Sequence, residues 1–346
     1  MRLDPSQLFS VTQEILLRAG VDSEQARTVT ENLIWCDQVG RRNHGIERLP
    51  ILLKHVAAGT IHCPPALSFE TLTPSVERLD ADQAFGHHAG RVAIDRAVER
   101  ADHHGVGIVG VLNSNFFGAG AYYAYRAAEA GKISLVLSNS FPKVAAPGGL
   151  QAALGTNPFA FGAPRRNGRH LLVDMSTAAV AGSTVREKAA AGEQFEPGVA
   201  IDDAGEPILD PNQVMRGTLL PAAGAKGFGL GLMVELLSAV LTGAAMSHEV
   251  GSMYKDLEKS GNNGHFLLAI DIQKWMPLEA YFERVETLAD ALFQSGQSGA
   301  VRLPGEGRWQ HFDDSEKNGI AIEPDILEPF EALAAKYEVR VPWRAL

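Results

Sequence analysis

The sequence predicts an α/β fold that begins with a purely helical region. Two observations carry this prediction. Over the first sixty residues, apolar side chains recur at the three- and four-residue spacing of amphipathic helices. From about Val76 onward, short apolar runs typical of strands alternate with further helical segments, which is the pattern of a sheet whose strands are connected by helices.

Three helices are expected in the N-terminal region, and capping residues and glycines indicate their limits. The first is ended by Gly20. The second is capped by Asp22 or Ser23 and runs to residue 38. The third is expected at residues 44–59, which would place His44 at its first turn.

The rest of the chain alternates between the two kinds of element, with a loop-rich middle that Pro and Gly interrupt. Helices are expected at residues 90–104, 119–130, 227–241, 278–293 and from 323 onward. Strands are expected at residues 106–112, 133–138, 159–161, 171–174 and 265–271.

Composition excludes several classes of protein. The chain has 346 residues, of which 45% are apolar, and its net charge of −10 argues against a protein that binds nucleic-acid backbones. Cys36 and Cys63 lack the spacing of a disulfide framework or a zinc site. No signal peptide is expected before the first helix, and the most apolar segment, residues 228–245, is interrupted by Glu235. We therefore expect a cytoplasmic protein with no bound metal and no membrane partner.

The sequence contains one familiar glycine motif, but the predicted structural context differs from that of the functional motif. Residues 105–110 match GxGxxG, which binds a pyrophosphate where a strand passes into a helix. Here a predicted helix precedes the glycines and a predicted strand contains them, so a tight helix-to-strand turn is expected and the fold is not of the Rossmann type. The histidine pairs at 87–88 and 103–104 lack the spacing of metal ligands and are expected on the surface.

The segment around His44 and Arg48 carries a recognisable chemistry. On one helical face, an imidazole beside a guanidinium suits the reduction of a 2-oxo acid. Arg48 can hold a carboxylate in a two-pronged hydrogen bond, and His44 can protonate the oxygen as hydride reaches the carbon. On spacing alone, a surface ion pair of Arg48 with Glu47 and a capping role for His44 are equally compatible with the sequence.

Three other segments are suited to anions. Residues 113–120 lie where a strand becomes a helix, and residues 174–177 end a strand with acceptors and hydroxyls. Lys226 enters a helix between two glycines, where a cation and free amides suit a phosphate. Caps and turns use the same residues, but the three segments together favour a dinucleotide site.

With these segments in view, the chain resembles the malate/L-lactate dehydrogenase family of NAD(P)-dependent oxidoreductases over nearly its whole length. The family also contains sulfolactate and ureidoglycolate dehydrogenases, diketogulonate reductase and piperideine/pyrroline-2-carboxylate reductases. The resemblance rests on HGIERLP at residues 44–50, GTNPFAFGAP at 155–164, and motifs at 113–118, 174–177, 226–230, 233–237, 264–266 and 302–306.

The resemblance implies a non-Rossmann, mixed-sheet α/β domain at residues 71–274. Residues 1–70 and roughly 275–346 would form a helical domain from both chain termini, and the protein would be a homodimer. It implies that His44 is the proton donor, assisted by Asn43, and that Arg48 binds the substrate carboxylate. The implied cofactor contacts are Phe116, Phe117, Gly118, Ala119, Gly120, Asp174, Met175, Ser176, Ala225, Lys226, Pro304, Gly305 and Glu306.

Three positions depart from the family pattern. Asn43 replaces a common Ser and is expected to hydrogen-bond the imidazole through its amide oxygen. Phe116 replaces a common His that is the acid/base of the ureidoglycolate type, so that activity is disfavoured. Ala225 replaces the usual His before Lys226. The pocket is therefore expected to be less polar than usual, with a substrate bulkier or more apolar than malate.

The predicted function is reversible hydride transfer between NAD(P)H and C2 of a small 2-oxo or 2-hydroxy carboxylic acid. The alternatives are reduction of a cyclic imino acid and a non-catalytic paralogue that binds NAD(P). The sequence does not distinguish NAD from NADP, although Arg308 stands where it could meet a 2′-phosphate.

Overall fold

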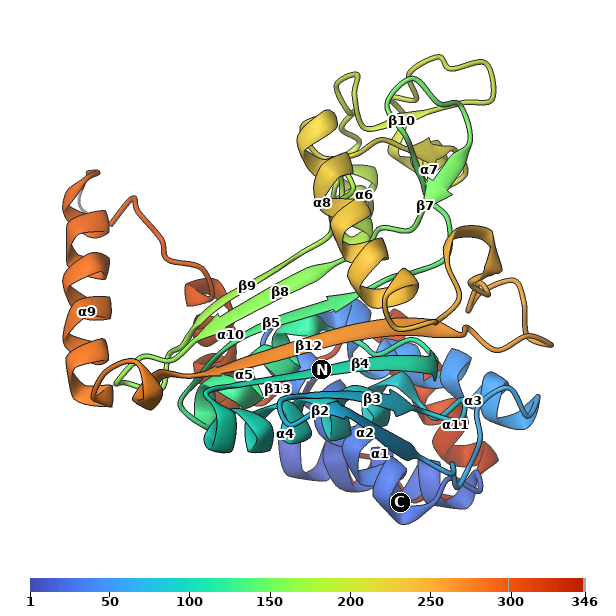
Figure 1. Cartoon of the computed structure of the whole chain (residues 1–346). Coiled ribbons are helices and arrows are strands. Elements are labelled where there is room, and N and C mark those ends of the chain that lie inside the picture. Colours follow the sequence, from blue (N-terminus) through green and yellow to red (C-terminus); the bar gives the residue numbers. More distant parts are fainter. Residues whose placement is uncertain (298, 345–346) are drawn as a thin grey trace.

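A twisted seven-stranded sheet forms the centre of the molecule (Figure 1). The computed structural model describes residues 1–297 and 299–344. The strand order is β2-β3-β4-β12-β5-β8-β9, and β3 and β4 are parallel whereas the other neighbours are antiparallel. The strands are β2 (Ser68–Thr73), β3 (Val76–Asp80), β4 (Val106–Ser114), β5 (Lys132–Ser138), β8 (Phe159–Ala163), β9 (Leu171–Met175) and β12 (Asn263–Asp271). This mixed sheet confirms the predicted fold class.

Two helices cover one face of the sheet, α4 (Gly86–His104) and α5 (Gly120–Glu129). The apolar side chains between them and the strands form the main core. Gly105 ends α4 with a φ of +83°, and β4 follows directly. A Cβ at Gly107 would lie 2.0 Å from the carbonyl oxygen of Ala97, so this glycine allows β4 to pack against α4. The expectation of a helix-to-strand turn at the GxGxxG sequence is therefore confirmed.

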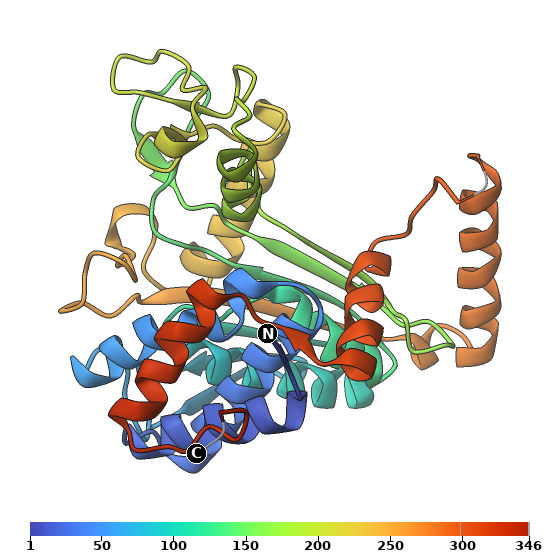
Figure 2. The same cartoon turned by 180° about the vertical axis from the view of Figure 1, so that it is seen from behind.

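Both chain ends build a helical layer beneath these helices (Figure 2). β1 (Arg2–Leu3) pairs with β13 (Ile320–Ala321), which ties the termini together. A second hydrophobic cluster joins α1 (Pro5–Arg18), α2 (Ser23–Gln38), α3 (Leu49–Ala57) and α11 (Pro324–Lys336). The expectation of a helical domain made from both termini is confirmed, while the exact domain boundaries stay a prediction.

The opposite face of the sheet is only partly covered. α8 (Ala225–Glu235) continues into one π-helical turn at Leu236–Val240 and stands over one end of the sheet, while α9 (Leu278–Gln294) projects from the other end (Figures 1 and 2). A small sheet of order β10-β11-β6-β7 lies beyond α8 with α6 (Gly182–Ala191) and α7 (Pro211–Val214). Its strands are β6 (Val144–Ala145), β7 (Ala152–Leu154), β10 (Ala200–Ile201) and β11 (Thr218–Leu219).

Some features differ from the sequence-based expectations. The third helix begins at Leu49 and not at His44. β2, α6 and α10 (Glu306–Asn318) were not anticipated. His87 and His88 are buried in α4, contrary to the expected surface position, because this first turn of α4 packs beneath the loop that follows β4. Within the described parts of the chain, no helix is both long enough and apolar enough to cross a bilayer.

Candidate active site

A cavity of about 1400 Å³ opens between the end of the large sheet, the small sheet and the N-terminal helical layer. It is larger than the ~300–1,000 Å³ of most single-ligand pockets, which leaves room for a dinucleotide and a small acid together. His44, Arg48, the 116–120 segment and the 174–176 segment all line it. The structure thus brings the predicted substrate residues and two of the predicted cofactor segments to one place.

His44 and Arg48 reach the cavity from two short 3₁₀ turns, Arg42–His44 and Ile46–Arg48. The predicted helix over both residues is wrong, because Gly45 between the turns is extended. Asp37 of α2 causes this break: its Oδ2 accepts a hydrogen bond from the backbone N–H of Ile46 at 2.9 Å. A Cβ at Gly45 would lie 1.9 Å from Oδ1 of Asp37, so only glycine fits there. Burial raises the pKa of Asp37 to about 8.

The ring of His44 lines the cavity, and its two nitrogens differ in burial. Nδ1 is buried and has no hydrogen-bond partner, whereas Nε2, also without a partner in the described structure, is accessible from the cavity. Burial, followed by the positive charges of Arg48 and Arg41, lowers the pKa of His44 to about 3. The imidazole is therefore neutral at pH 7 until a negative charge arrives beside it.

Arg48 is held so that much of its guanidinium stays free for a ligand. Its Nε donates to the carbonyl oxygen of Asn43 at 2.6 Å, and its Nη2 lies 3.6 Å from Glu47. The ring of Tyr254 lies 5.7 Å from the guanidinium carbon. Only 15% of the side chain is exposed. A carboxylate in the cavity would meet a pre-oriented cation with donors to spare.

Asn43 does not act as the sequence suggested. No hydrogen bond joins its amide to His44, whose Nδ1 stays unpaired. Consecutive residues in a 3₁₀ turn point about 120° apart, so the two side chains diverge. Asn43 also lines the cavity, and its backbone carbonyl orients Arg48 instead.

The 116–120 segment forms a largely apolar wall beside His44. The ring of Phe116 stacks on His44 with centroids 5.9 Å apart and meets His87 edge-on at 5.6 Å. Gly118 has a φ of +78°, and a Cβ at Gly120 would lie 2.9 Å from Cβ of Ala160. These glycines let the backbone run close to the end of the sheet, where a flat ring could lie against it.

Residues 174–177 connect the predicted cofactor segments. The carboxylate of Asp174 lies near Gly120 and 3.4 Å from Nη2 of Arg308, the second residue after Glu306. The carbonyl of Thr177 accepts from the N–H of Ala222, shortly before α8. The end of β9 therefore contacts the 116–120 segment, Arg308 and the residues that precede α8.

Some predicted cofactor residues do not line the cavity in the described structure. Ala225 and Lys226 are exposed at the start of α8. Pro304, Gly305 and Glu306 form a turn against β9, where the carbonyl of Pro304 accepts from the N–H of Leu172. Arg308 is only 7% exposed and contacts Asp174, so it does not stand free for a 2′-phosphate.

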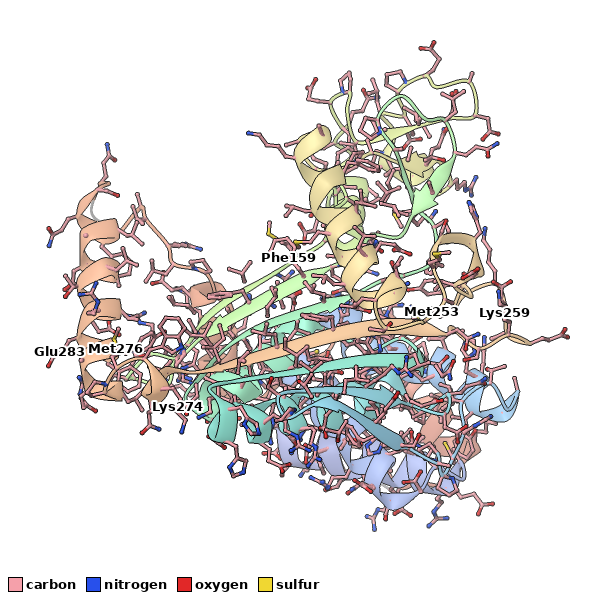
Figure 3. All side chains as sticks on the ribbon, in the orientation of Figure 1. Phe159, Met253, Lys259, Lys274, Met276 and Glu283 are labelled. Carbon is pink, nitrogen blue, oxygen red and sulfur yellow. The ribbon has the colours of Figure 1, made fainter. Side chains whose placement is uncertain are left out.

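Sequence reasoning missed several residues of the site. Arg41 and Arg186 line the cavity, and Tyr254 lies on the loop that leads into β12. His55 of α3 holds this loop through a hydrogen bond between its Nε2 and the carbonyl of Met253. Figure 3 labels Met253 on this loop. Asp37 had one detectable signal, a carboxylate inside the otherwise apolar end of α2. Arg41 immediately precedes a short 3₁₀ turn, and its sequence context gives no comparable signal.

Comparisons with known proteins identify the family of the chain. Residues 3–331 match the family model described as malate/L-lactate dehydrogenase. The chain is 34% identical to the malate dehydrogenase of Pyrococcus abyssi, over 98% of this chain and 96% of that protein. It is 32% identical to the malate/(S)-sulfolactate dehydrogenase of Methanothermus fervidus, over 99% and 100%. Other relatives specify NAD⁺ or NADP⁺ in their names.

Solved structures show the same fold. The structure of delta1-piperideine-2-carboxylate reductase from Pseudomonas syringae pathovar tomato superimposes with a TM-score of 0.88 at 31% identity. The match covers 96% of this chain and all of that one.

Proposed function

The chain belongs to the malate/L-lactate dehydrogenase family and is an NAD(P)-dependent dehydrogenase of small 2-hydroxy and 2-oxo acids, and from this premise we propose how its cavity works. The observation that carries the proposal is that Nε2 of His44 and the free edge of Arg48 open into one cavity. A proton donor and a carboxylate clamp are the two groups that reduction of a 2-oxo acid requires from the protein.

The residues present fit a nicotinamide dinucleotide. The glycine-containing 116–120 segment offers a close backbone surface, and Arg308 keeps one buried nitrogen, Nη1, without a partner beside Asp174. Asp174 and Ser176 would hold the part of the cofactor that lies in the cavity. Lys226 and the 304–306 turn, which do not line the cavity, would contact the part of the cofactor that extends beyond it. When bound, the reduced nicotinamide supplies a hydride. We leave the preference between NAD and NADP open.

The protein's own groups divide the remaining work. Arg48 binds the 1-carboxylate of the substrate. This contact fixes the distance between C2 of the substrate and the imidazole of His44. Nε2 of His44 delivers a proton to the oxygen on C2 during reduction and removes it during oxidation. The stack of Phe116 on the imidazole excludes water from one side of the ring. Asp37 and Gly45 position His44 through the backbone of the two turns.

A substrate screen tests this proposal. NADH and NADPH oxidation is followed with a panel of 2-oxo acids and a panel of cyclic imino acids. We expect turnover of at least one 2-oxo acid, and the reverse reaction with the matching 2-hydroxy acid. Turnover of cyclic imines alone would replace this proposal with the second candidate. Absence of NADH and NADPH binding at millimolar concentration would contradict both.

The second candidate is reduction of a cyclic imino acid. It is favoured by the apolar wall of Phe116 and by the likeness to a piperideine-2-carboxylate reductase. Arg48 would bind the same carboxylate, and His44 would protonate the ring nitrogen instead of an oxygen.

We also propose a homodimer that forms through the open face of the sheet. Large apolar side chains are exposed on α8 and its π-helical turn, on α9 and between them: Leu230, Leu236, Val240, Leu241, Trp275 and Leu288. Phe159 of β8 lies on the same side of the sheet (Figure 3). Neither cysteine forms a disulfide, which suits the cytoplasm that we propose as its location. Light scattering would measure the mass in solution.

A further inference from the structure

The 251–261 loop leads into β12 and lines one side of the cavity, above α3 in the view of Figure 1. Its two ends are joined, because the backbone N–H of Gly251 donates to the carbonyl of Gly261 at 3.1 Å. The N–H of Gly261 in turn donates to Oδ1 of the buried Asn115 at 2.8 Å. Asn115 directly precedes Phe116, so the base of the loop is fixed to the segment that forms the apolar wall of the site.

A buried histidine fixes the tip of this loop to the N-terminal helical layer. His55 is only 5% exposed, and its Nε2 lies 2.9 Å from the carbonyl oxygen of Met253. Its Nδ1 lies 2.7 Å from the hydroxyl of Thr60. Because a carbonyl can only accept, Nε2 carries the proton and Nδ1 accepts from Thr60. The imidazole is therefore held at both nitrogens, and it fixes the backbone immediately before Tyr254.

Tyr254 is the side chain that the loop brings to Arg48. The guanidinium carbon of Arg48 lies 5.7 Å from the centroid of the tyrosine ring, and the ring of Phe141 meets Tyr254 edge-on at 6.0 Å. The tyrosine is 52% exposed and lines the cavity. An aromatic ring attracts the charge of a guanidinium and keeps water from part of it, but it does not occupy the N–H groups that a carboxylate needs.

The chain of a bound acid would extend toward this ring. In the function proposed above, Arg48 binds the 1-carboxylate and His44 reaches the oxygen on C2. The cofactor would occupy the side of the cavity formed by residues 174–176, and Phe116 covers His44. The substituent that begins at C3 is then left with the part of the cavity that Tyr254 lines.

We propose that Tyr254 is a specificity-determining residue that limits the size of the substituent at C3, and that His55 positions it. A small substituent passes beside the ring, whereas a branched one collides with it. The proposal rests on the function proposed above, because it requires Arg48 to bind the carboxylate of the substrate.

The test compares two 2-oxo acids of equal charge and different size, pyruvate and 4-methyl-2-oxopentanoate. We expect kcat/KM of the unmodified protein to favour pyruvate. Tyr254→Ala should lower the ratio of the two values about tenfold or more, within the roughly 10–200-fold effect of one methylene in an apolar pocket. Tyr254→Phe keeps the ring and should keep the ratio. Phe69→Ala is the matched control, because this exposed ring of β2 lies 5.5 Å from the guanidinium carbon of Arg96, away from the cavity.

Variants of His55 test its positioning role. His55→Leu removes the donor to the carbonyl of Met253, so the substrate ratio should change in the same direction as in Tyr254→Ala, by a smaller factor. His55→Gln supplies another N–H donor and should restore part of the ratio. A His55→Leu protein that melts at a lower temperature but keeps the ratio would limit His55 to a structural role.

Two results would overturn the assignment of Tyr254. One is the same substrate ratio in the unmodified protein and in Tyr254→Ala. The other is a Tyr254→Ala protein whose KM for NAD(P)H rises while the substrate ratio stays constant, because the ring would then face the cofactor.

Binding without cofactor separates this inference from the proposed function, because neither acid can then react. Pyruvate should raise the melting temperature more than 4-methyl-2-oxopentanoate does. This difference should disappear in Tyr254→Ala and persist in Phe69→Ala. If neither acid binds and none is reduced, the proposed function fails. If both bind and the difference survives in Tyr254→Ala, only this inference fails.

Discussion

The two walls of the cavity differ in how completely their polar groups are paired. On the cofactor wall, residues 174–177, the hydroxyls of Ser176 and Thr177 both donate to the carbonyl of Thr156, and Asp174 contacts Arg308. On the substrate wall, formed by Arg41, His44 and Arg48, Nδ1 of His44 and the guanidinium of Arg41 have no partner in the described structure. The polar side chains of residues 174–177 are thus mostly paired within the protein. The difference is one of degree, because Nη1 of Arg308, beside Asp174, is also buried without a partner in the described structure.

The backbones of the two walls explain this difference. The cofactor wall continues β9, whose neighbours β8 and the 304–306 turn fix its backbone. The substrate wall consists of two 3₁₀ turns that one carboxylate, Asp37, holds in place. Variants on the substrate wall should therefore change catalysis and acid binding, while variants on the cofactor wall should change cofactor affinity.

The largest effect is expected from His44→Asn. Asparagine keeps a polar group but cannot move a proton, so kcat should fall by roughly 10²–10⁴-fold, the usual contribution of a positioned acid. Fluorescence titration should show unchanged NAD(P)H binding, because His44 belongs to the substrate wall. His103→Asn, on the exposed end of α4, is the control. Turnover near that of the unmodified protein would remove His44 from the mechanism.

Arg48→Lys should have the next largest effect. Lysine keeps the charge but loses the planar pair of donors. KM for the acid should rise about tenfold or more, which corresponds to about 1.4 kcal/mol. Steady-state kinetics with saturating cofactor measures this change. An unchanged KM would return Arg48 to the role of an ion-pair partner of Glu47.

A smaller effect is expected on the cofactor wall. Arg308→Met keeps the buried stem but removes the partner of Asp174. The Kd of NAD(P)H should rise by a few-fold to about tenfold, within the ~0.5–1.5 kcal/mol of an ordinary hydrogen bond. KM for the acid, measured at saturating cofactor, should stay the same. If KM for the acid changes and the Kd of the cofactor does not, the division between the two walls is wrong.

How much the sequence predicts depends on how local the signal is. The strands β4, β5 and β12 and the helices α1, α2 and α9 follow from apolar periodicity within each segment. β2 is exposed along its whole length and α10 is highly charged, so neither carries a hydrophobic pattern that could reveal it.

The candidate site was predicted in part, for a similar reason. His44 and Arg48 were recognised by their chemistry and by the family resemblance. Their helix was wrong because its break depends on a contact with the side chain of Asp37, nine residues before Ile46 on the preceding helix, and apolar periodicity does not report such a contact. Arg41 and its missing partner become visible only when the cavity is assembled.

The pH dependence of reduction tests the central claim, that His44 of the substrate wall carries the proton, most directly. Burial and the surrounding guanidiniums lower the pKa of His44 to about 3. Above that pKa, the protonated fraction needed for reduction falls roughly tenfold per pH unit. We predict that kcat/KM of the unmodified protein falls with this slope between about pH 5 and pH 8, while oxidation of the hydroxy acid is nearly constant. A plateau up to about pH 6.5, or the same slope in His44→Asn, would contradict the account.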